Sequence, residues 1–88
     1  MKTFKDLDFE RHKLDPTGTI ASTDFSNGYG VSVITGKMFY TSPGKPYELA
    51  VLRGDNLCYD TPITDDVLGH LTARRVTAIM KRVQALKS

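Results

Sequence analysis

Three carboxylates late in the chain have the type and spacing that could support acid-base chemistry or hold a hard cation. Asp60, Asp65 and Asp66, here called the acidic cluster, lie close together in the sequence, and carboxylate oxygens are ligands that Mg²⁺ accepts. Asp65 and Asp66 also follow Thr64, so they can be first-turn acids of a short helix, where each offsets the helix dipole by about 0.3–1 kcal/mol. We favour this capping interpretation because it explains both positions without a bound ion.

The soft metal ligands are far apart in the sequence. His12, Cys58 and His70 include no close pair of the Cys-x-x-Cys or His-x-x-x-His kind, and zinc sites normally draw on such pairs. Cys58 lies in a short predicted strand, which favours a buried small side chain over a nucleophile. The glycines form no Walker or dinucleotide motif. The sequence therefore predicts no metal, no cofactor and no enzymatic activity.

A basic segment at the C-terminal end is the best remaining candidate for a binding site. Residues 73–88 contain no acid, and a helical period places Arg74 and Lys81 opposite the apolar stripe, with Arg75 and Arg82 in a neighbouring row. Such a face suits phosphates or an acidic protein. Two first-turn arginines conflict with the helix dipole. Two ways to offset this unfavourable interaction stay open: ion pairs with the acidic cluster inside the chain, or contact with an anionic partner outside it.

The predicted scaffold begins with a small antiparallel sheet. β-rich runs indicate strands at residues 18–25, 29–35, 47–53 and 57–59. Asn27-Gly28 favours a hairpin because both residues tolerate positive φ, Gly54-Asp55-Asn56 reverses the chain again, and 36–46 is a long connection. We expect a four-stranded antiparallel β-meander.

A helical part is predicted to follow the sheet. A short helix is expected from Thr64 to about His70, and Thr72 caps a longer C-terminal helix. The longer helix has an apolar stripe that must pack on the sheet; its members are Val76, Ile79, Met80, Val83 and Leu86. The expected fold class is α+β in a single domain, residues 1–88, with an N-terminal arm (1–16), a sheet (17–60) and a helical part (64–87).

Size and composition narrow the classes of protein. An 88-residue chain is near the lower end of what buries a self-sufficient core, so a homodimer is a reasonable expectation. The net charge of +2 is too small for a strong polyanion binder. No apolar run is long enough for a membrane span. One cysteine and a charged N-terminus without a secretory signal favour a cytoplasmic setting.

Three segments carry a family resemblance: NGYGVSV at 27–33, YELAVL at 47–52 and YDTPITDDVLGHLT at 59–72. Together they resemble small uncharacterised proteins of tailed bacteriophages and prophages, over roughly residues 4–86. The resemblance implies a bacterial cytoplasm and a viral accessory role, and it brings no activity, cofactor or catalytic residue. That group often has acids after the position of Thr72, whereas this chain has Ala73-Arg74-Arg75, so a basic-helix role would be particular to this chain.

The sequence as a whole predicts a non-enzymatic accessory protein that acts by protein–protein interaction. A host factor and a second copy of the chain are the candidate partners. The alternative is a low-affinity nucleic-acid-binding module that uses the basic C-terminal helix, with Arg74, Arg75, Lys81 and Arg82 as the binding residues.

Overall fold

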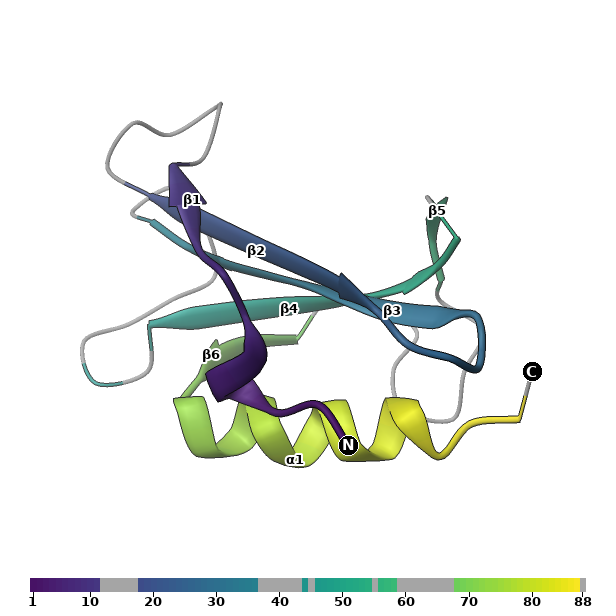
Figure 1. The fold of residues 1–88 in the computed structure, drawn as a ribbon. Coiled ribbons are helices and arrows are strands. Elements are labelled where there is room, and N and C mark those ends of the chain that lie inside the picture. The colour runs from purple at the N-terminus through teal and green to yellow at the C-terminus, as the bar shows by residue number, and fades with distance from the viewer. Residues whose placement is uncertain (12–17, 37–43, 45, 55, 59–67, 88) are drawn as a thin grey trace.

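The fold is a curved antiparallel sheet with one long helix on one face (Figure 1). The computed structural model describes residues 1–11, 18–36, 44, 46–54, 56–58 and 68–87. Within these residues the elements are η1 (Phe4–Asp6), β1 (Glu10–Arg11), β2 (Thr19–Asp24), β3 (Tyr29–Thr35), β4 (Tyr47–Arg53), β5 (Asn56–Leu57), β6 (Leu68–Leu71) and α1 (Ala73–Gln84).

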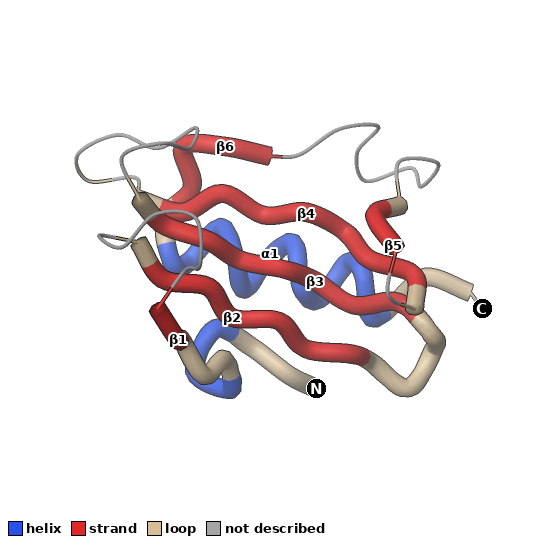
Figure 2. The backbone as a smooth tube through the Cα atoms, turned by 90° about the horizontal axis from the view of Figure 1, so that it is seen from above, coloured by secondary structure: helices blue, strands red, loops and turns tan. Residues whose placement is uncertain are grey.

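The sheet confirms the predicted α+β class and the antiparallel meander. Its strands follow the order β1-β2-β3-β4-β5, and β6 pairs with β4 as well. β5 and β6 share the outer edge of β4, since Leu57 lies opposite Leu52 near one end and Leu71 opposite Tyr47 at the other. Figure 2 shows these two short strands at opposite ends of that edge. β1 and β6 are strands that the sequence did not predict.

The core lies between the sheet and α1, which packs on β3 and β4. Strand side chains alternate between faces, so every second residue of β3 and β4 points to the helix. The apolar stripe of α1 meets them, as predicted. The largest fully buried side chains all come from this contact: Val31, Val33, Leu49, Val51, Val76, Ile79, Met80 and Val83. Thr72 caps the helix as expected, with its Oγ1 accepting from the Arg75 amide at 3.2 Å.

The end of the predicted short helix is wrong. Residues 68–70 belong to β6 instead, and the backbone of this strand pairs with the edge of β4. Gly69 and His70 lie opposite the single residue Glu48, which makes a β-bulge with His70 at a φ of 54°. The backbone hydrogen bonds gained by pairing with the open edge of β4 outweigh the weak local preference of these residues for a helix. The earlier part of that helix and the acidic cluster lie outside the described residues.

The β2–β3 hairpin forms where Asn-Gly predicted it, but by a different turn. The Gly28 amide donates to the Phe25 carbonyl at 3.1 Å, and the Phe25 amide donates to the Tyr29 carbonyl at 2.7 Å. Gly28 has a φ of 89°, whereas Asn27 does not have a positive φ. The turn therefore has three residues with glycine in the left-handed position. Asn27 is left to serve another purpose.

The Asn27 side chain closes the C-terminal end of α1. Its Nδ2 donates to the carbonyl oxygens of Val83 and Leu86, at 2.9 Å each, and lies 3.3 Å from that of Gln84. Its Oδ1 accepts from the Tyr29 amide at 3.1 Å. The last carbonyls of a helix have no partner within the helix. One hairpin residue thus supplies the cap and ties the far end of the sheet to the helix.

We predict that Asn27→Ala lowers the free energy of unfolding by about 1–3 kcal/mol, because it leaves part-buried carbonyls without a donor. Asn27→Asp should cost more than Asn27→Ala, since it places an anion at the negative end of the helix dipole. Added salt should shrink that difference. Urea unfolding followed by circular dichroism, at low and at high salt, measures the free energy of unfolding of the wild type, Asn27→Ala and Asn27→Asp. The exposed neighbour Ser26 offers the control Ser26→Ala, and wild-type stability in Asn27→Asp would contradict the cap.

Candidate functional site

The N-terminal arm is fastened along α1 by hydrogen bonds with defined partners. The Lys2 amide donates to Gln84 Oε1 at 2.8 Å, and Gln84 Nε2 donates back to the Lys2 carbonyl at 2.7 Å. Two helical turns closer to the start of α1, the Phe4 amide donates to Thr77 Oγ1 at 3.1 Å. Thr77 and Gln84 lie seven positions apart, so they share one flank of the helix. The arm therefore runs antiparallel to α1 along that flank.

Lys2 also joins the arm to the sheet. Its Nζ lies 2.9 Å from Thr23 Oγ1 and 3.0 Å from the Asp24 carbonyl, both on β2. Because the backbone of Lys2 binds the helix and its side chain binds β2, this residue bridges the two layers. Such charge-assisted contacts hold the start of the arm in place.

The single turn η1 directs the apolar side chains of the arm inward. The Asp6 carboxylate accepts from the Thr3 amide at 2.7 Å, and the Asp6 amide donates to the Thr3 carbonyl at 2.9 Å. After this turn the arm becomes extended, so Leu7 and Phe9 face the sheet while Asp8 is exposed. Leu7 is buried and Phe9 half-buried.

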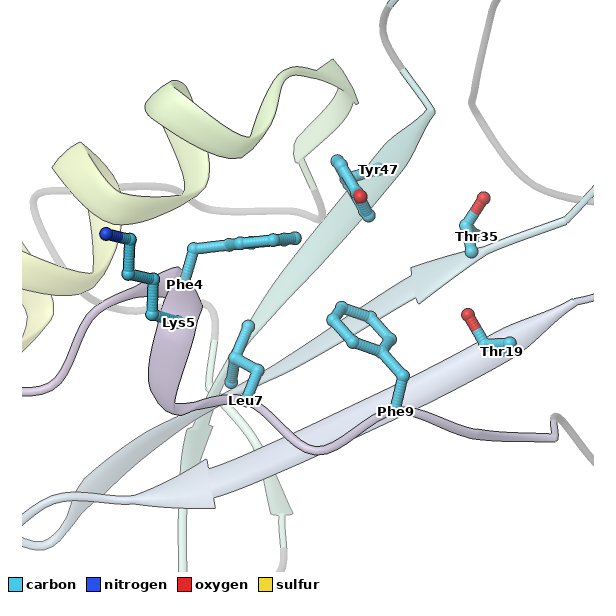
Figure 3. Close-up of a pocket in the computed structure, with 7 residues that line it drawn as sticks. All are labelled: Phe4, Lys5, Leu7, Phe9, Thr19, Thr35 and Tyr47. Carbon is cyan, nitrogen blue, oxygen red and sulfur yellow. The ribbon is translucent and has the colours of Figure 1, made fainter.

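A pocket of about 480 Å³ lies where the arm crosses the end of the sheet (Figure 3). One wall is the arm, and the other is formed by the first residues of β2 and β4 and the last residue of β3. The described lining residues are Phe4, Lys5, Leu7, Phe9, Thr19, Thr35 and Tyr47. Its volume falls within the range of about 300–1,000 Å³ that is usual for ligand sites.

Three aromatic rings form the apolar part of this aromatic pocket. The ring centroids of Phe4 and Tyr47 are 5.0 Å apart with an edge-on angle of 66°, and Phe9 lies 5.7 Å from Phe4 and 6.0 Å from Tyr47. These separations are those of favourable aromatic pairs. All three residues are only half-buried. The rings therefore pack on one another and still leave apolar surface toward the pocket.

The polar groups of the described lining residues are hydroxyls and one ammonium group. Thr19 and Thr35 present hydroxyls in Figure 3, and the Lys5 ammonium extends away from the rings. The described lining residues include no carboxylate, imidazole or thiol, so they offer no nucleophile with an adjacent base. An apolar side chain or a small planar molecule is the occupant that such a lining accepts.

The basic residues predicted from the sequence are exposed along α1. Arg74, Arg75, Lys81 and Arg82 all face solvent, and none forms an ion pair with another described residue. They lie on two flanks of the helix: Arg74 and Lys81 are three and four residues from Thr77, whereas Arg75 and Arg82 lie on the side away from the arm. These are the two rows that the helical period predicts, and the structure adds that Arg74 and Lys81 form the row nearer the arm.

The other predicted candidates are dispersed. Cys58 is buried, as expected for a structural thiol. His70 is exposed in β6, and His12 lies outside the described residues. In the part of the chain that the structure describes, no group of three or more His, Cys, Asp or Glu side chains could hold a metal ion. Nor does any described helix have the length and hydropathy needed to cross a bilayer.

The aromatic pocket is the site that sequence reasoning missed. The apolar residues of the arm were expected to cover part of the core, and the described ones do: Leu7 belongs to the core, and Phe4 and Phe9 pack against it. The pocket that Phe4 and Phe9 also line was not expected. The alternation of Leu7 and Phe9 with acidic residues gave a weak signal of an extended segment with one apolar face. Its meeting with Tyr47 depends on long-range packing that no local pattern encodes.

Comparison of the chain with protein-family models, curated proteins and solved structures found no match.

We predict that Gln84→Ala loosens the arm without unfolding the domain. Hydrogen exchange of the Phe4 amide should become about five- to tenfold faster, because two hydrogen bonds to Lys2, at about 0.5–1.5 kcal/mol each, are lost. Gln84→Glu keeps the acceptor for the Lys2 amide and removes the donor to the Lys2 carbonyl. The exchange rate of the Phe4 amide in this variant should therefore lie between those of the wild type and Gln84→Ala. Equal rates in all three proteins, measured by NMR, would contradict the proposed fastening.

Proposed function

We propose that this chain is a small accessory protein that works by binding another protein rather than by catalysis. The observation that carries the proposal is the aromatic pocket, a surface hollow lined by three half-buried rings. Buried aromatic and aliphatic anchors seated in pockets dominate the free energy of many protein interfaces. A projecting side chain of the partner is the expected occupant.

The pocket is preformed, which favours high affinity for a partner through a small contact surface. Phe4 and Lys2 fasten the arm to α1 and β2, so the wall that the arm supplies does not have to be ordered when a partner arrives. Ordering interface groups costs binding free energy, and preorganisation reduces that cost. A domain of this size can therefore gain useful affinity from one anchoring contact.

The setting that we propose follows from the resemblance in the sequence: a bacterial cytoplasm, with a phage or prophage accessory role. The partner would be a host or phage protein. A second copy of the chain is the other candidate, and light scattering of the purified protein measures that directly. A dimeric mass would support self-association, and a monomeric mass would leave a different protein as the partner.

We expect affinity capture from nuclease-treated bacterial lysate to recover a defined protein in a pocket-dependent way. Phe9→Ala removes a ring, and Thr35→Trp fills the hollow from the β3 side without removing packing. Each should raise the Kd of the purified partner by at least about tenfold, the loss expected for an anchor contact. Identification by mass spectrometry and titration calorimetry supply the readout.

The matched control is Leu57→Ala, which removes an apolar side chain that is 54% exposed on β5. It should leave the Kd of the partner unchanged within about twofold, as expected for a residue outside the interface. Cooperative unfolding of every variant establishes that it folds. A partner whose affinity is insensitive to both Phe9→Ala and Thr35→Trp would overturn the pocket as the binding site.

A second candidate function is nucleic-acid binding by α1, favoured by four exposed cations without an ion pair among the described residues. Binding to single-stranded DNA or RNA should then weaken steeply with salt, because phosphate contacts release counterions. Two double variants test this: Arg74→Glu with Lys81→Glu, and Arg75→Glu with Arg82→Glu. Each should reduce the salt dependence of the affinity for single-stranded DNA or RNA. Unchanged binding in both double variants, measured by fluorescence anisotropy, would exclude this function.

A further inference from the structure

The arm adds a third cation to one flank of α1. Because the Phe4 amide is bonded to Thr77, the next residue, Lys5, lies beside the helix flank that contains Thr77. Arg74 and Lys81 are three residues before and four residues after Thr77, so they occupy the same flank. Lys5, Arg74 and Lys81, here called the cationic flank, are all exposed.

Lys5 connects the cationic flank to the aromatic pocket. Lys5 belongs to both, since its side chain lines the pocket and its ammonium extends away from the rings (Figure 3). None of the three cations forms an ion pair with a described residue. The acids of the arm form no ion pair with them: Asp6 is bonded to Thr3, and Asp8 and Glu10 are exposed. The pocket is therefore lined by one cation, Lys5, and the other two cations lie on the helix flank beside which Lys5 is held.

The arrangement of the rings favours a polypeptide over a nucleic acid as the occupant. A nucleic base needs an open ring face on which to stack. Phe4, Phe9 and Tyr47 instead meet one another at angles of 40–66° with centroids 5.0–6.0 Å apart, so they form a socket and not a flat platform. A socket of ring edges and faces suits one inserted side chain.

We infer, on the basis of the proposed function, that the partner presents an acidic peptide segment with an aromatic anchor. The anchor, Phe, Tyr or Trp, enters the aromatic pocket, and Asp or Glu residues close to it in the peptide face Lys5, Arg74 and Lys81. Charges at the rim of an interface act mainly on the association rate and the salt dependence. The pocket supplies affinity and the cationic flank selects for acidic neighbours.

Panning a random peptide library against the intact protein tests the inference. The expected result is enrichment of peptides that combine one aromatic residue with nearby acids. For the best peptide, Phe9→Ala and Thr35→Trp should each raise the Kd by about tenfold. The double variant Arg74→Glu with Lys81→Glu should raise it by about fivefold or more at low salt, and Lys5→Glu by a smaller factor.

The chain supplies a matched control for charge. Arg75→Glu with Arg82→Glu reverses the same number of charges on the other flank of the same helix, and it should leave the Kd within about twofold of wild type. Equal losses in the two double variants would overturn the inference, because they would mean a general charge effect. Enriched peptides without acids would also overturn it.

The inference and the proposed function fail in different ways. A captured protein that depends on Phe9 but not on the cationic flank would leave the proposed function in place and refute the acidic segment. Enriched peptides whose affinity ignores both pocket variants would refute both. Salt-sensitive binding of single-stranded nucleic acid that loses affinity on reversal of either flank would refute the inference in favour of the second candidate function.

Discussion

Burial of the apolar face of α1 against β3 and β4 is the contact on which the rest of the structure depends. Four residues of the helix are at most 2% exposed: Val76, Ile79, Met80 and Val83. At about 1.5–3 kcal/mol for each buried side chain, this contact is a leading favourable term in so small a domain. It also sets the position of every polar group on the helix, and those groups hold the rest of the chain.

Two ties follow from the placement of α1. Asn27 reaches from the β2–β3 hairpin to the last carbonyls of the helix, while Gln84 and Thr77 hold the arm along its flank. The aromatic pocket exists because the second tie keeps the arm over the sheet. The pocket and the stability of the domain therefore depend on the same helix. A substitution in α1 that alters its packing is expected to alter the pocket as well.

The elements that the sequence predicted correctly are those with a strong periodicity of apolar residues. β3 and β4 match their predicted ranges, and α1 begins after its predicted cap at Thr72, because alternation of side chains and a helical stripe are local properties. β1 and β6 were missed because each is a short segment that becomes a strand only by pairing with a neighbour. For the site, the cations of α1 and their two rows were predictable from the helical period, whereas the position of the arm beside one of these rows required the tertiary structure.

The sequence by itself determined the elements: hydrophobic periodicity specifies which residues must leave water, and capping and turn residues specify where a helix or hairpin begins. Only the tertiary structure decided which of these residues meet. Phe4, Phe9 and Tyr47 are distant in the chain and become one pocket, and Lys5 joins Arg74 and Lys81 through the bond at Thr77. Side-chain contacts between remote segments depend on how layers pack, and a local pattern holds no information about that geometry.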